Sequence, residues 1–531
     1  MTAAGDWVWW RDGVLYQCYP RSFADATGDG VGDLRGITGR LDHLAWLGID
    51  GLWLNPTFPS PNADWGFDVS DYRGVHPELG TMADLDALIA GARERGIQVL
   101  LDLVPNHTSD QHEWFAASRA SRESPRRDWY VWRDPGPGGE PPNNWRSVFG
   151  GSAWQLDEAT GQMYLHNFLP EQPDLDWWNE EVRAAFDDIL RFWFDRGIAG
   201  FRIDVAHGIV KDRELRDNPA STPDDRVQWR RLGQRPVFSR NRPDVHEVLK
   251  RWRTLCDGRD PAPVLVGETW VHELERLVEF YGTGGDELHL AFNFVFMEAP
   301  FEADVLAPIV ARTEELIPPE AWPVWALSNH DVVRFPTRWA DGDPRRARVA
   351  MMLLLTLRGT PVLYYGDEVG MPESEVPEDR ILDPVALGES GQRGRDGART
   401  PMPWSAEEGG GFTAAGVEPW LPFGDLGAAN VADQREDPGS MLHLCRDLIA
   451  LRRGDTGLRT GRYAQVPAAP GAWAFRRGDG ALVALNLGSA PVGVEGATGT
   501  IAVGTDRARD GERVDGALAL GPYEGAVVIA A

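Results

Sequence analysis

Eight short apolar segments recur along this 531-residue chain, and most of them are followed by a longer segment with helical periodicity. The apolar segments occupy residues 14–23, 51–55, 98–106, 200–206, 263–268, 288–294, 323–330 and 360–367. Helical patterns lie between them over residues 82–95, 181–196, 246–256 and 345–357. Alternation of strand and helix implies parallel pairing, and eight such units predict an α/β fold, a closed (β/α)₈ TIM barrel.

Two long segments fall outside the barrel repeat. Residues 108–179, rich in Trp, Pro, Gly and Asn, are too long for a structureless loop, and they predict a small domain inserted after the third strand, over the mouth of the barrel. Residues 456–531 contain short apolar runs and glycine turns without a long helix, which predicts a C-terminal antiparallel β-sandwich. The predicted catalytic barrel then comprises residues 1–107 and 180–455.

The bulk composition excludes several classes of protein. A formal net charge of −28 argues against a nucleic-acid partner, and a small neutral substrate fits better. The three widely spaced cysteines form neither a disulfide framework nor a zinc motif, and nothing indicates an organic cofactor. Residues 1–11 lack the pattern of a secretory leader, and no apolar run is long enough to span a bilayer. We therefore expect a cytoplasmic protein with no membrane contact, and the sequence gives no indication of its oligomeric state.

Charged side chains stand at the end of the fourth apolar segment. Phe201, Ile203 and Val205 alternate with Arg202 and Asp204, so a period of two places both charged groups on one face of the strand. Taken alone, this pattern indicates a buried salt bridge, which is costly without compensation. Three other segments, residues 99–107, 264–268 and 324–331, also end in polar side chains. In a (β/α)₈ barrel these ends share one face, where active sites lie.

The residue types at these ends indicate cleavage of a glycosidic bond. Asp204 and Glu268, on neighbouring strands, supply the two carboxyl groups that the reaction requires. Arg202 is expected to hold Asp204 ionised, and the apolar neighbours of Glu268 are expected to keep it protonated as the acid. Asp331, beside His330, is expected to bind sugar hydroxyls and to favour ring distortion.

The four polar-ended segments resemble the four signature regions of the α-amylase superfamily, glycoside hydrolase family 13. Residues 172–177 resemble a further motif of its oligo-1,6-glucosidase and α-glucosidase branch, and residues 359–368 resemble the motif of the eighth strand. The resemblance implies that Asp204 is the nucleophile, Glu268 the acid/base and Asp331 the stabiliser of the transition state. It also implies retention of configuration through a covalent glucosyl-enzyme, with carboxyl groups about 5–5.5 Å apart.

Further positions of the same motifs imply contacts with the sugar. Arg202, His107 and His330 match residues that support the ring in the first subsite. Residues 64–68 and 395–402 resemble segments with which exo-acting members close the pocket. This implies that Asp64 and Arg399 bind the terminal hydroxyl of the non-reducing end, and that Phe67 replaces a stacking tyrosine.

A loop near the N-terminus has alternating oxygen donors suited to a hard cation. It resembles the calcium loop of the same branch, which implies a structural Ca²⁺ or Mg²⁺. The predicted ligands are Asp25, Thr27, Asp29, Val31 and Asp33. Gly36 stands where an EF-hand carries its bidentate glutamate, so that motif is excluded. A metal-free turn remains the alternative.

The preferred interpretation is an exo-acting retaining α-glucosidase that releases glucose from short α-linked oligosaccharides. The resemblance places Val205 at a position where relatives carry residues correlated with linkage preference, and there valine implies α-1,6 bonds. Residues 206–208 depart from the α-1,6 pattern of these relatives, so we expect α-1,4 bonds to be favoured over α-1,6. An oligo-1,6-glucosidase, a transglucosylase or a trehalose-synthase-type isomerase stays open, because these enzymes share the catalytic residues and differ in how well they exclude water. An inactive binding homologue should lack Asp204 or Glu268. A metal-dependent hydrolase would need a ligand cluster, whereas His107 and His330 lie in sugar-binding motifs.

Overall fold

The protein forms a closed barrel with two further units attached to it. The structure, a computed structural model, describes residues 7–388 and 391–530; residues 1–6, part of the segment inspected for a leader, lie outside them. In the described chain, eight parallel strands pair in the order β10-β11-β1-β2-β3-β7-β8-β9, and a bridge between Phe292 and Val324 closes the ring. They are β1 (Leu15–Cys18), β2 (Gly51–Leu54), β3 (Gln98–Leu103), β7 (Gly200–Ile203), β8 (Val264–Gly267), β9 (Leu290–Ala291), β10 (Val324–Ala326) and β11 (Thr360–Tyr364). The predicted (β/α)₈ barrel is confirmed.

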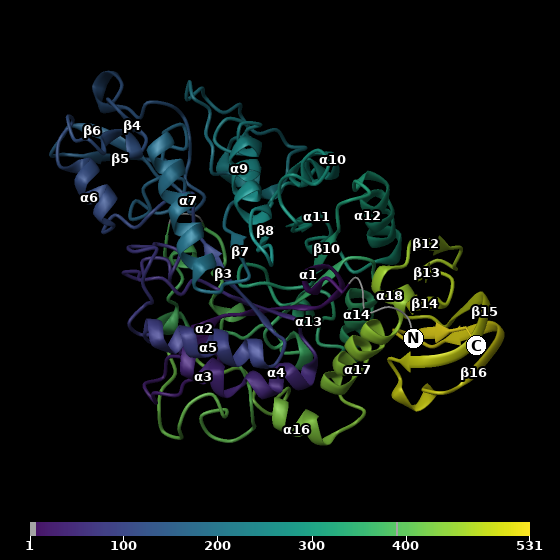
Figure 1. Cartoon of the computed structure of the whole chain (residues 1–531). Coiled ribbons are helices and arrows are strands. Elements are labelled where there is room, and N and C mark those ends of the chain that lie inside the picture. Colours follow the sequence, from purple (N-terminus) through teal and green to yellow (C-terminus); the bar gives the residue numbers. More distant parts are fainter. Residues whose placement is uncertain (1–6, 389–390, 531) are drawn as a thin grey trace.

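Helices surround this ring of strands (Figure 1). The longer ones are α4 (Leu41–Leu47), α5 (Met82–Glu94), α7 (Glu180–Asp195), α9 (Val245–Asp257), α12 (Ala303–Leu316), α14 (Pro344–Thr356) and α17 (Met441–Gly454). Shorter ones are α1 (Trp9–Asp12), α2 (Pro20–Phe23), α3 (Leu34–Gly39), α10 (Leu274–Leu277), α11 (Phe294–Met297), α13 (Phe335–Arg338), α15 (Pro384–Leu387) and α16 (Val431–Glu436). The helical patterns at 82–95, 181–196, 246–256 and 345–357 correspond to α5, α7, α9 and α14.

The strands place alternate side chains inside and outside the barrel. Leu15, Trp53 and Leu100 belong to one inner apolar cluster, which also includes residues of the other strands. Asp102 of β3 lies opposite Arg202 of β7 in the strand register. The prediction from the period of two is therefore correct: the charged groups lie beyond the apolar layers, toward the carboxyl ends of the strands.

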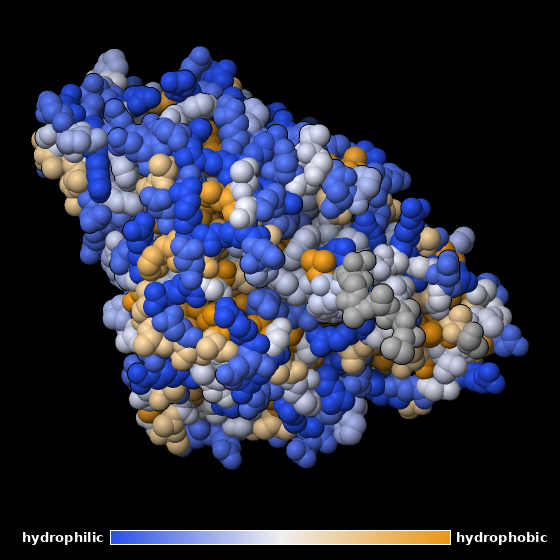
Figure 2. Space-filling view, viewed as in Figure 1, coloured by the Kyte–Doolittle hydropathy of each residue, from blue (hydrophilic) through white to orange (hydrophobic). Residues whose placement is uncertain are grey.

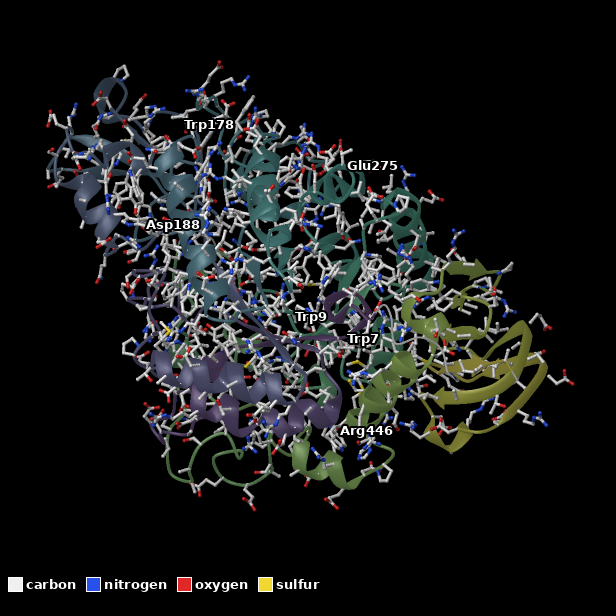
Figure 3. The ribbon with its side chains drawn as sticks, in the orientation of Figure 1. Trp7, Trp9, Trp178, Asp188, Glu275 and Arg446 are labelled. Carbon is white, nitrogen blue, oxygen red and sulfur yellow. The ribbon has the colours of Figure 1, made fainter. Side chains whose placement is uncertain are left out.

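Two segments between β3 and α9 form a cover at this end of the barrel. The insertion contains α6 (Glu113–Arg119), β4 (Trp132–Arg133), β5 (Trp154–Asp157) and β6 (Gln162–Leu165), and its described strands pair as an antiparallel sheet. Residues 205–244, which include α8 (Val227–Leu232), form a long excursion after β7. Leu215 and Phe238 of this excursion pack on the apolar core of the insertion, and the indole nitrogen of Trp178 (Figure 3) donates to the Lys211 carbonyl at 3.0 Å.

The C-terminal unit follows α18 (Thr456–Thr460) and lies against the barrel beside α14 and α17 (Figure 1). Its described residues form one six-stranded antiparallel sheet, where the sequence predicted a sandwich of two. The strands are β12 (Tyr463–Val466), β13 (Ala472–Arg477), β14 (Ala481–Asn486), β15 (Val492–Gly504), β16 (Arg513–Leu520) and β17 (Gly525–Ile529). The sheet is continuous because the long strand β15 pairs with β16 in its first part and with β17 in its last, with register shifts in both pairings.

Hydrophilic residues cover most of the face seen in Figure 2, with hydrophobic residues scattered between them. Among the described residues, no helix combines the length and the apolar character needed to cross a membrane.

Candidate active site

A pocket of about 390 Å³ opens at the carboxyl ends of the barrel strands, between the insertion and the excursion. Its volume lies in the range of small-molecule sites. Loops that follow the barrel strands form its floor, and Phe149 and Phe168 of the insertion contribute to a wall. The predicted residues that line it are Asp64, Phe67, His107, Asp204, Glu268, His330 and Asp331.

Arg202 lies beneath the floor and holds three carboxyl groups together. Its Nη1 donates to Asp204 Oδ1 at 2.6 Å and to Asp102 Oδ1 at 2.7 Å, and its Nη2 donates to Glu268 Oε2 at 2.8 Å. Asp204 and Glu268 therefore sit on two nitrogens of one guanidinium group. This arrangement brings them into a single site, as a glycosidase carboxyl pair requires. The predicted convergence of the Asp204 and Glu268 carboxyl groups is present.

The backbone fixes where these carboxyl groups point. The Asp204 and Glu268 amides continue the strand ladders, donating to the carbonyls of Leu103 at 2.8 Å and Ile203 at 2.9 Å. The chain then leaves the sheet at Val205, whose φ of 46° is left-handed and strained for a β-branched residue. In this conformation the Val205 amide donates to Glu268 Oε2 at 2.8 Å. The strained residue therefore lies directly after Asp204, and its amide orients the Glu268 carboxyl group.

The charge of this cluster differs in part from the prediction. Burial raises the pKa of Asp204 well above its usual range, and the carboxyl groups of Glu268 and Asp102 act in the same direction. Arg202 lowers the pKa of Asp204, as expected, but by less than burial raises it. Burial also raises the pKa of Asp102 to about 7 against the opposing charge of Arg202. One guanidinium among three buried carboxyl groups therefore favours retention of a proton in the cluster.

Asp331 has the opposite environment on the facing side of the pocket. Its Oδ1 accepts from Arg399 Nη2 at 3.0 Å and from Arg395 Nη1 at 3.1 Å, and its Oδ2 lies 3.2 Å from His330 Nε2. Burial alone would raise its pKa, but His330 and the two arginines outweigh burial and hold the pKa of Asp331 below its usual range. Asp331 is thus an ionised acceptor. The Gln17 amide nitrogen lies 2.7 Å from His330 Nδ1, which leaves the ring proton on Nε2, toward Asp331.

An ion pair closes one side of the pocket, and it involves an arginine that was not among the predicted site residues. Asp64 pairs with Arg395, whose Nη2 lies 2.7 Å from Asp64 Oδ1 and 2.7 Å from Asp383 Oδ1. Arg399, which was predicted to bind the terminal hydroxyl together with Asp64, is not among the residues that line the pocket. Arg399 is 0% exposed, and besides Asp331 it binds the His330 carbonyl at 2.9 Å, so it positions these two residues from behind. Burial raises the pKa of Asp64 to about 6, although Arg395 and Arg399 oppose the rise.

The remaining predicted residues complete the floor. Phe67 stacks on His330 with ring centroids 5.1 Å apart and planes 3° from parallel. His107 Nε2 lies 2.9 Å from the Phe67 carbonyl, and its Nδ1 lies 3.0 Å from the Asn106 amide nitrogen. Burial lowers the pKa of His107 to about 4, so the ring is neutral near pH 7.

The predicted cation loop is not among the residues that line this pocket. Asp25 accepts the amides of Gly28 at 2.6 Å and Gly30 at 2.8 Å. Asp33 accepts the amides of Ala26 at 2.8 Å and Gly36 at 2.8 Å, the second as the N-cap of α3. Over residues 7–388 and 391–530, no three His, Cys, Asp or Glu side chains gather as metal ligands. The carboxylates thus serve the loop's own hydrogen bonds, and the cation site with Asp25, Thr27, Asp29, Val31 and Asp33 stays a prediction.

Several site residues were absent from the sequence-based prediction. Asp102 and Gln17 are polar residues on the inner face of apolar strands. The alternation of residues along these strands could have predicted them. Arg395 lies in the same motif as Arg399, but only Arg399 was predicted as a site residue. The sequence did not predict that residues 226–241 form a wall of the pocket, because the excursion has no regular periodicity.

Comparison with known proteins agrees with this geometry. Residues 17–461 match the family described as alpha amylase, catalytic domain. A probable alpha-glucosidase of Rhizobium meliloti (strain 1021) is 44% identical over 89% of this chain and 87% of its own length. An oligo-1,6-glucosidase of Parageobacillus thermoglucosidasius is 39% identical over 86% and 85%, respectively. The crystal structure of the alpha-glucosyl transfer enzyme XgtA superimposes with a TM-score of 0.91 at 40% identity, covering 98% of this chain and 99% of that one.

Both the family match and the relatives cover most of the chain, and the structure provides the carboxyl groups that glycoside hydrolysis needs. The chain therefore belongs to the α-amylase family, as a glycoside hydrolase of the branch that contains the α-glucosidases and oligo-1,6-glucosidases.

Proposed function

We propose that the protein is an exo-acting α-glucosidase that removes glucose from the non-reducing end of short α-linked oligosaccharides with retention of configuration. The observation that carries this proposal is the pair of carboxyl groups on Arg202, beside a pocket closed by the ion pair of Asp64 and Arg395. A charged wall at that position can hold the hydroxyls of a chain end and blocks a continuing polymer.

Each carboxyl group has a distinct role in the proposed reaction. Asp204 attacks the anomeric carbon while Glu268 protonates the departing glycosidic oxygen, and Glu268 then takes a proton from the water that releases glucose. Asp331, ionised by its cationic neighbours, accepts hydrogen bonds from sugar hydroxyls as the ring distorts.

For linkage, we propose that α-1,4 bonds are cleaved faster than α-1,6 bonds. Residues 206–208 depart from the α-1,6 pattern of the family, and this supports the proposal against the contrary signal of Val205. Glucosyl transfer is a second candidate, because a solved structure 40% identical to this chain is an alpha-glucosyl transfer enzyme. Transfer requires the same covalent intermediate and an acceptor other than water.

One set of assays tests these statements. Hydrolysis of maltose, isomaltose, sucrose and trehalose gives the linkage preference, and predominant cleavage of isomaltose would overturn the α-1,4 proposal. Maltotriose labelled at its reducing end reports the direction of attack: early release of unlabelled glucose is expected, and early release of labelled glucose contradicts exo action. Proton NMR of the first product is expected to show α-glucose, since β-glucose would exclude retention. Longer oligosaccharides from maltose would indicate transfer.

A further inference from the structure

The outer part of the pocket is lined mainly by basic residues, although the molecule as a whole is acidic. The chain carries 81 acidic and 53 basic residues. Apart from Arg395 and the four carboxylates of the floor, the charged lining residues described are seven arginines and one acid, Glu273. We call these seven the arginine rim: Arg146, Arg226, Arg231, Arg235, Arg240, Arg276 and Arg393.

Most of the rim guanidinium groups are not saturated by the protein. Three of the seven have only distant carboxylates, at 3.9 Å for Arg226 and 3.5 Å for both Arg235 and Arg393. The other four make no ion pair or side-chain hydrogen bond within the described chain; they are Arg146, Arg231, Arg240 and Arg276. The arginines of the floor differ, since Arg202 and Arg395 each bind three carboxylates. Unsaturated guanidinium groups offer several donors and no acceptor.

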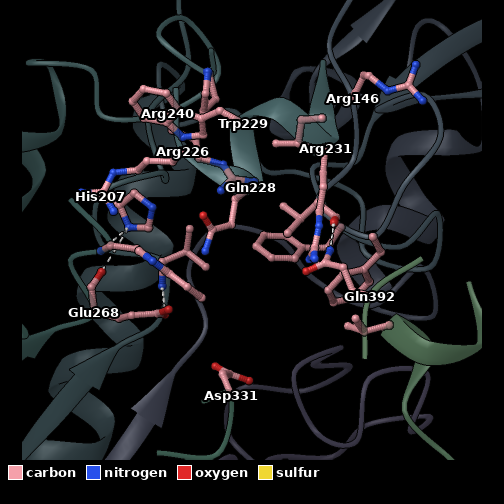
Figure 4. Close-up of a pocket in the computed structure, with 18 of the residues that line it drawn as sticks. Arg146, His207, Arg226, Gln228, Trp229, Arg231, Arg240, Glu268, Asp331 and Gln392 are labelled. Atoms are coloured by element: carbon pink, nitrogen blue, oxygen red, sulfur yellow. Dashed lines mark hydrogen bonds between the residues drawn. The ribbon is translucent and has the colours of Figure 1, made fainter. Parts of the chain in front are cut away.

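The rim lies on the side of the pocket where a leaving group must emerge. Figure 4 shows Arg226, Arg231 and Arg240 on one wall, across the opening from Asp331. In the proposed function the glucose unit lies against Asp64 and Arg395, and Arg395 also contacts Asp331. Arg240 is close enough to Glu268 for the two charges to interact, and burial lowers the pKa of Arg240. The group that Glu268 protonates therefore leaves into a donor-rich, positively charged space.

We propose that the arginine rim binds an anionic group on the leaving part of the substrate, so that the preferred substrates are α-glucosides whose aglycone carries a phosphate or a carboxylate. This inference rests on the proposed glucosidase function and specifies its substrate class. A neutral sugar presents donors as well as acceptors, whereas arginines only donate and match the oxygens of an anion. In the reaction, the bond from the anomeric carbon to the glycosidic oxygen breaks, Glu268 protonates that oxygen, water completes the glucose, and the anionic group leaves unchanged on the aglycone.

Paired substrates test the proposal on the intact enzyme. Maltose is compared with maltose phosphorylated at O6 of its reducing-end glucose, and maltitol is compared with maltobionate, which differs from it by a terminal carboxylate. We expect kcat/KM to be about tenfold higher for at least one anionic member of a pair, mainly through a lower KM, as for one added charge-assisted hydrogen bond. The preferred pair distinguishes phosphate from carboxylate. The preference should shrink at high salt, since exposed charges are screened. Equal or lower values for both anionic substrates would overturn the proposal.

A matched pair of variants on α8 localises the effect. Arg231 lines the pocket, and Arg230, beside it on the same helix and also exposed, does not. Arg231→Gln is expected to reduce the ratio of anionic to neutral kcat/KM at least threefold, whereas Arg230→Gln should leave the ratio unchanged; equal effects of the two would contradict the assignment. Arg240→Gln gives a second reading at a less exposed position.

The two proposals can fail separately. p-Nitrophenyl α-glucoside reports glucosidase activity without an anionic aglycone. If it is cleaved while the paired substrates show no preference for the anionic member, only the proposal about the arginine rim is refuted. Calorimetric binding of maltobionate and maltitol to the Asp204→Asn variant gives a readout that needs no turnover. If the wild-type protein cleaves none of the substrates but maltobionate still binds more tightly than maltitol, the result supports anion binding by the arginine rim and refutes the proposed function.

Discussion

Arg202 holds three carboxyl groups of the candidate active site together, because one planar guanidinium binds Asp102, Asp204 and Glu268 at once. A lysine offers a single point charge on a flexible stem and cannot bridge these groups in a fixed geometry. We expect Arg202→Lys to lower kcat on p-nitrophenyl α-glucoside about a hundredfold, the effect of a misplacement of roughly 1 Å. Arg513→Lys, an exposed substitution in β16, is the control. A kcat within threefold of wild type would show that the bridge is not needed.

The roles of Asp204 and Glu268 can be separated by rescue with azide. In Asp204→Gly the small anion can enter from the nucleophile's side and form β-glucosyl azide. In Glu268→Gly the covalent intermediate still forms from an activated aryl glucoside, and azide then gives α-glucosyl azide. Each variant alone is expected to lose more than about 10³-fold in kcat on unactivated substrates. NMR of the azide products checks the assignment, and the same anomer from both variants would exclude it.

At the scale of elements, a buried ion pair joins the excursion to the insertion. Lys211 Nζ lies 2.8 Å from Asp174 Oδ2, with side-chain exposures of 4% and 0%. Lys211→Met leaves the Asp174 carboxylate buried without this partner, and we expect a loss of about 3–5 kcal/mol in the free energy of unfolding, measured with urea. Lys250, the other lysine of the chain, is an exposed residue 3.7 Å from Asp286, so Lys250→Met should cost about 1 kcal/mol at most. Similar losses in both variants would contradict this role of the pair.

The elements also show what the sequence reveals and what it hides. The barrel strands were predictable because each is a short apolar run with its polar residues grouped at one end, as in residues 200–204. The excursion was not, since residues 205–244 are held by contacts with a distant insertion instead of by local periodicity. Arg395 and Arg399 lie four residues apart in one motif, and only the folded chain shows which one reaches Asp64. Similarly, the register shifts in β15 depend on its pairing with two different strands.

At the scale of the whole molecule, the barrel keeps several histidines buried and neutral. Burial lowers the pKa of His107 to about 4, and those of His112, His207, His272 and His289 to about 3. Unfolding exposes these rings, so the unfolded chain binds more protons than the folded one between about pH 3 and pH 6.5. The stability from their neutral burial is complete above pH 6.5 and is lost as the pH falls toward the folded pKa values.

His289 provides a test of this linkage away from the pocket. Its Nδ1 accepts the Leu265 amide at 3.1 Å, a contact that the side-chain oxygen of an asparagine can replace. Between pH 7 and pH 5 the wild-type free energy of unfolding is expected to fall by about 2 kcal/mol more than that of His289→Asn, because one proton uptake on unfolding is removed. Urea unfolding at a series of pH values measures this difference. Above pH 7 the two curves should run parallel. Parallel curves down to pH 5 would mean that His289 is already protonated in the folded protein or that its pKa is unchanged by folding.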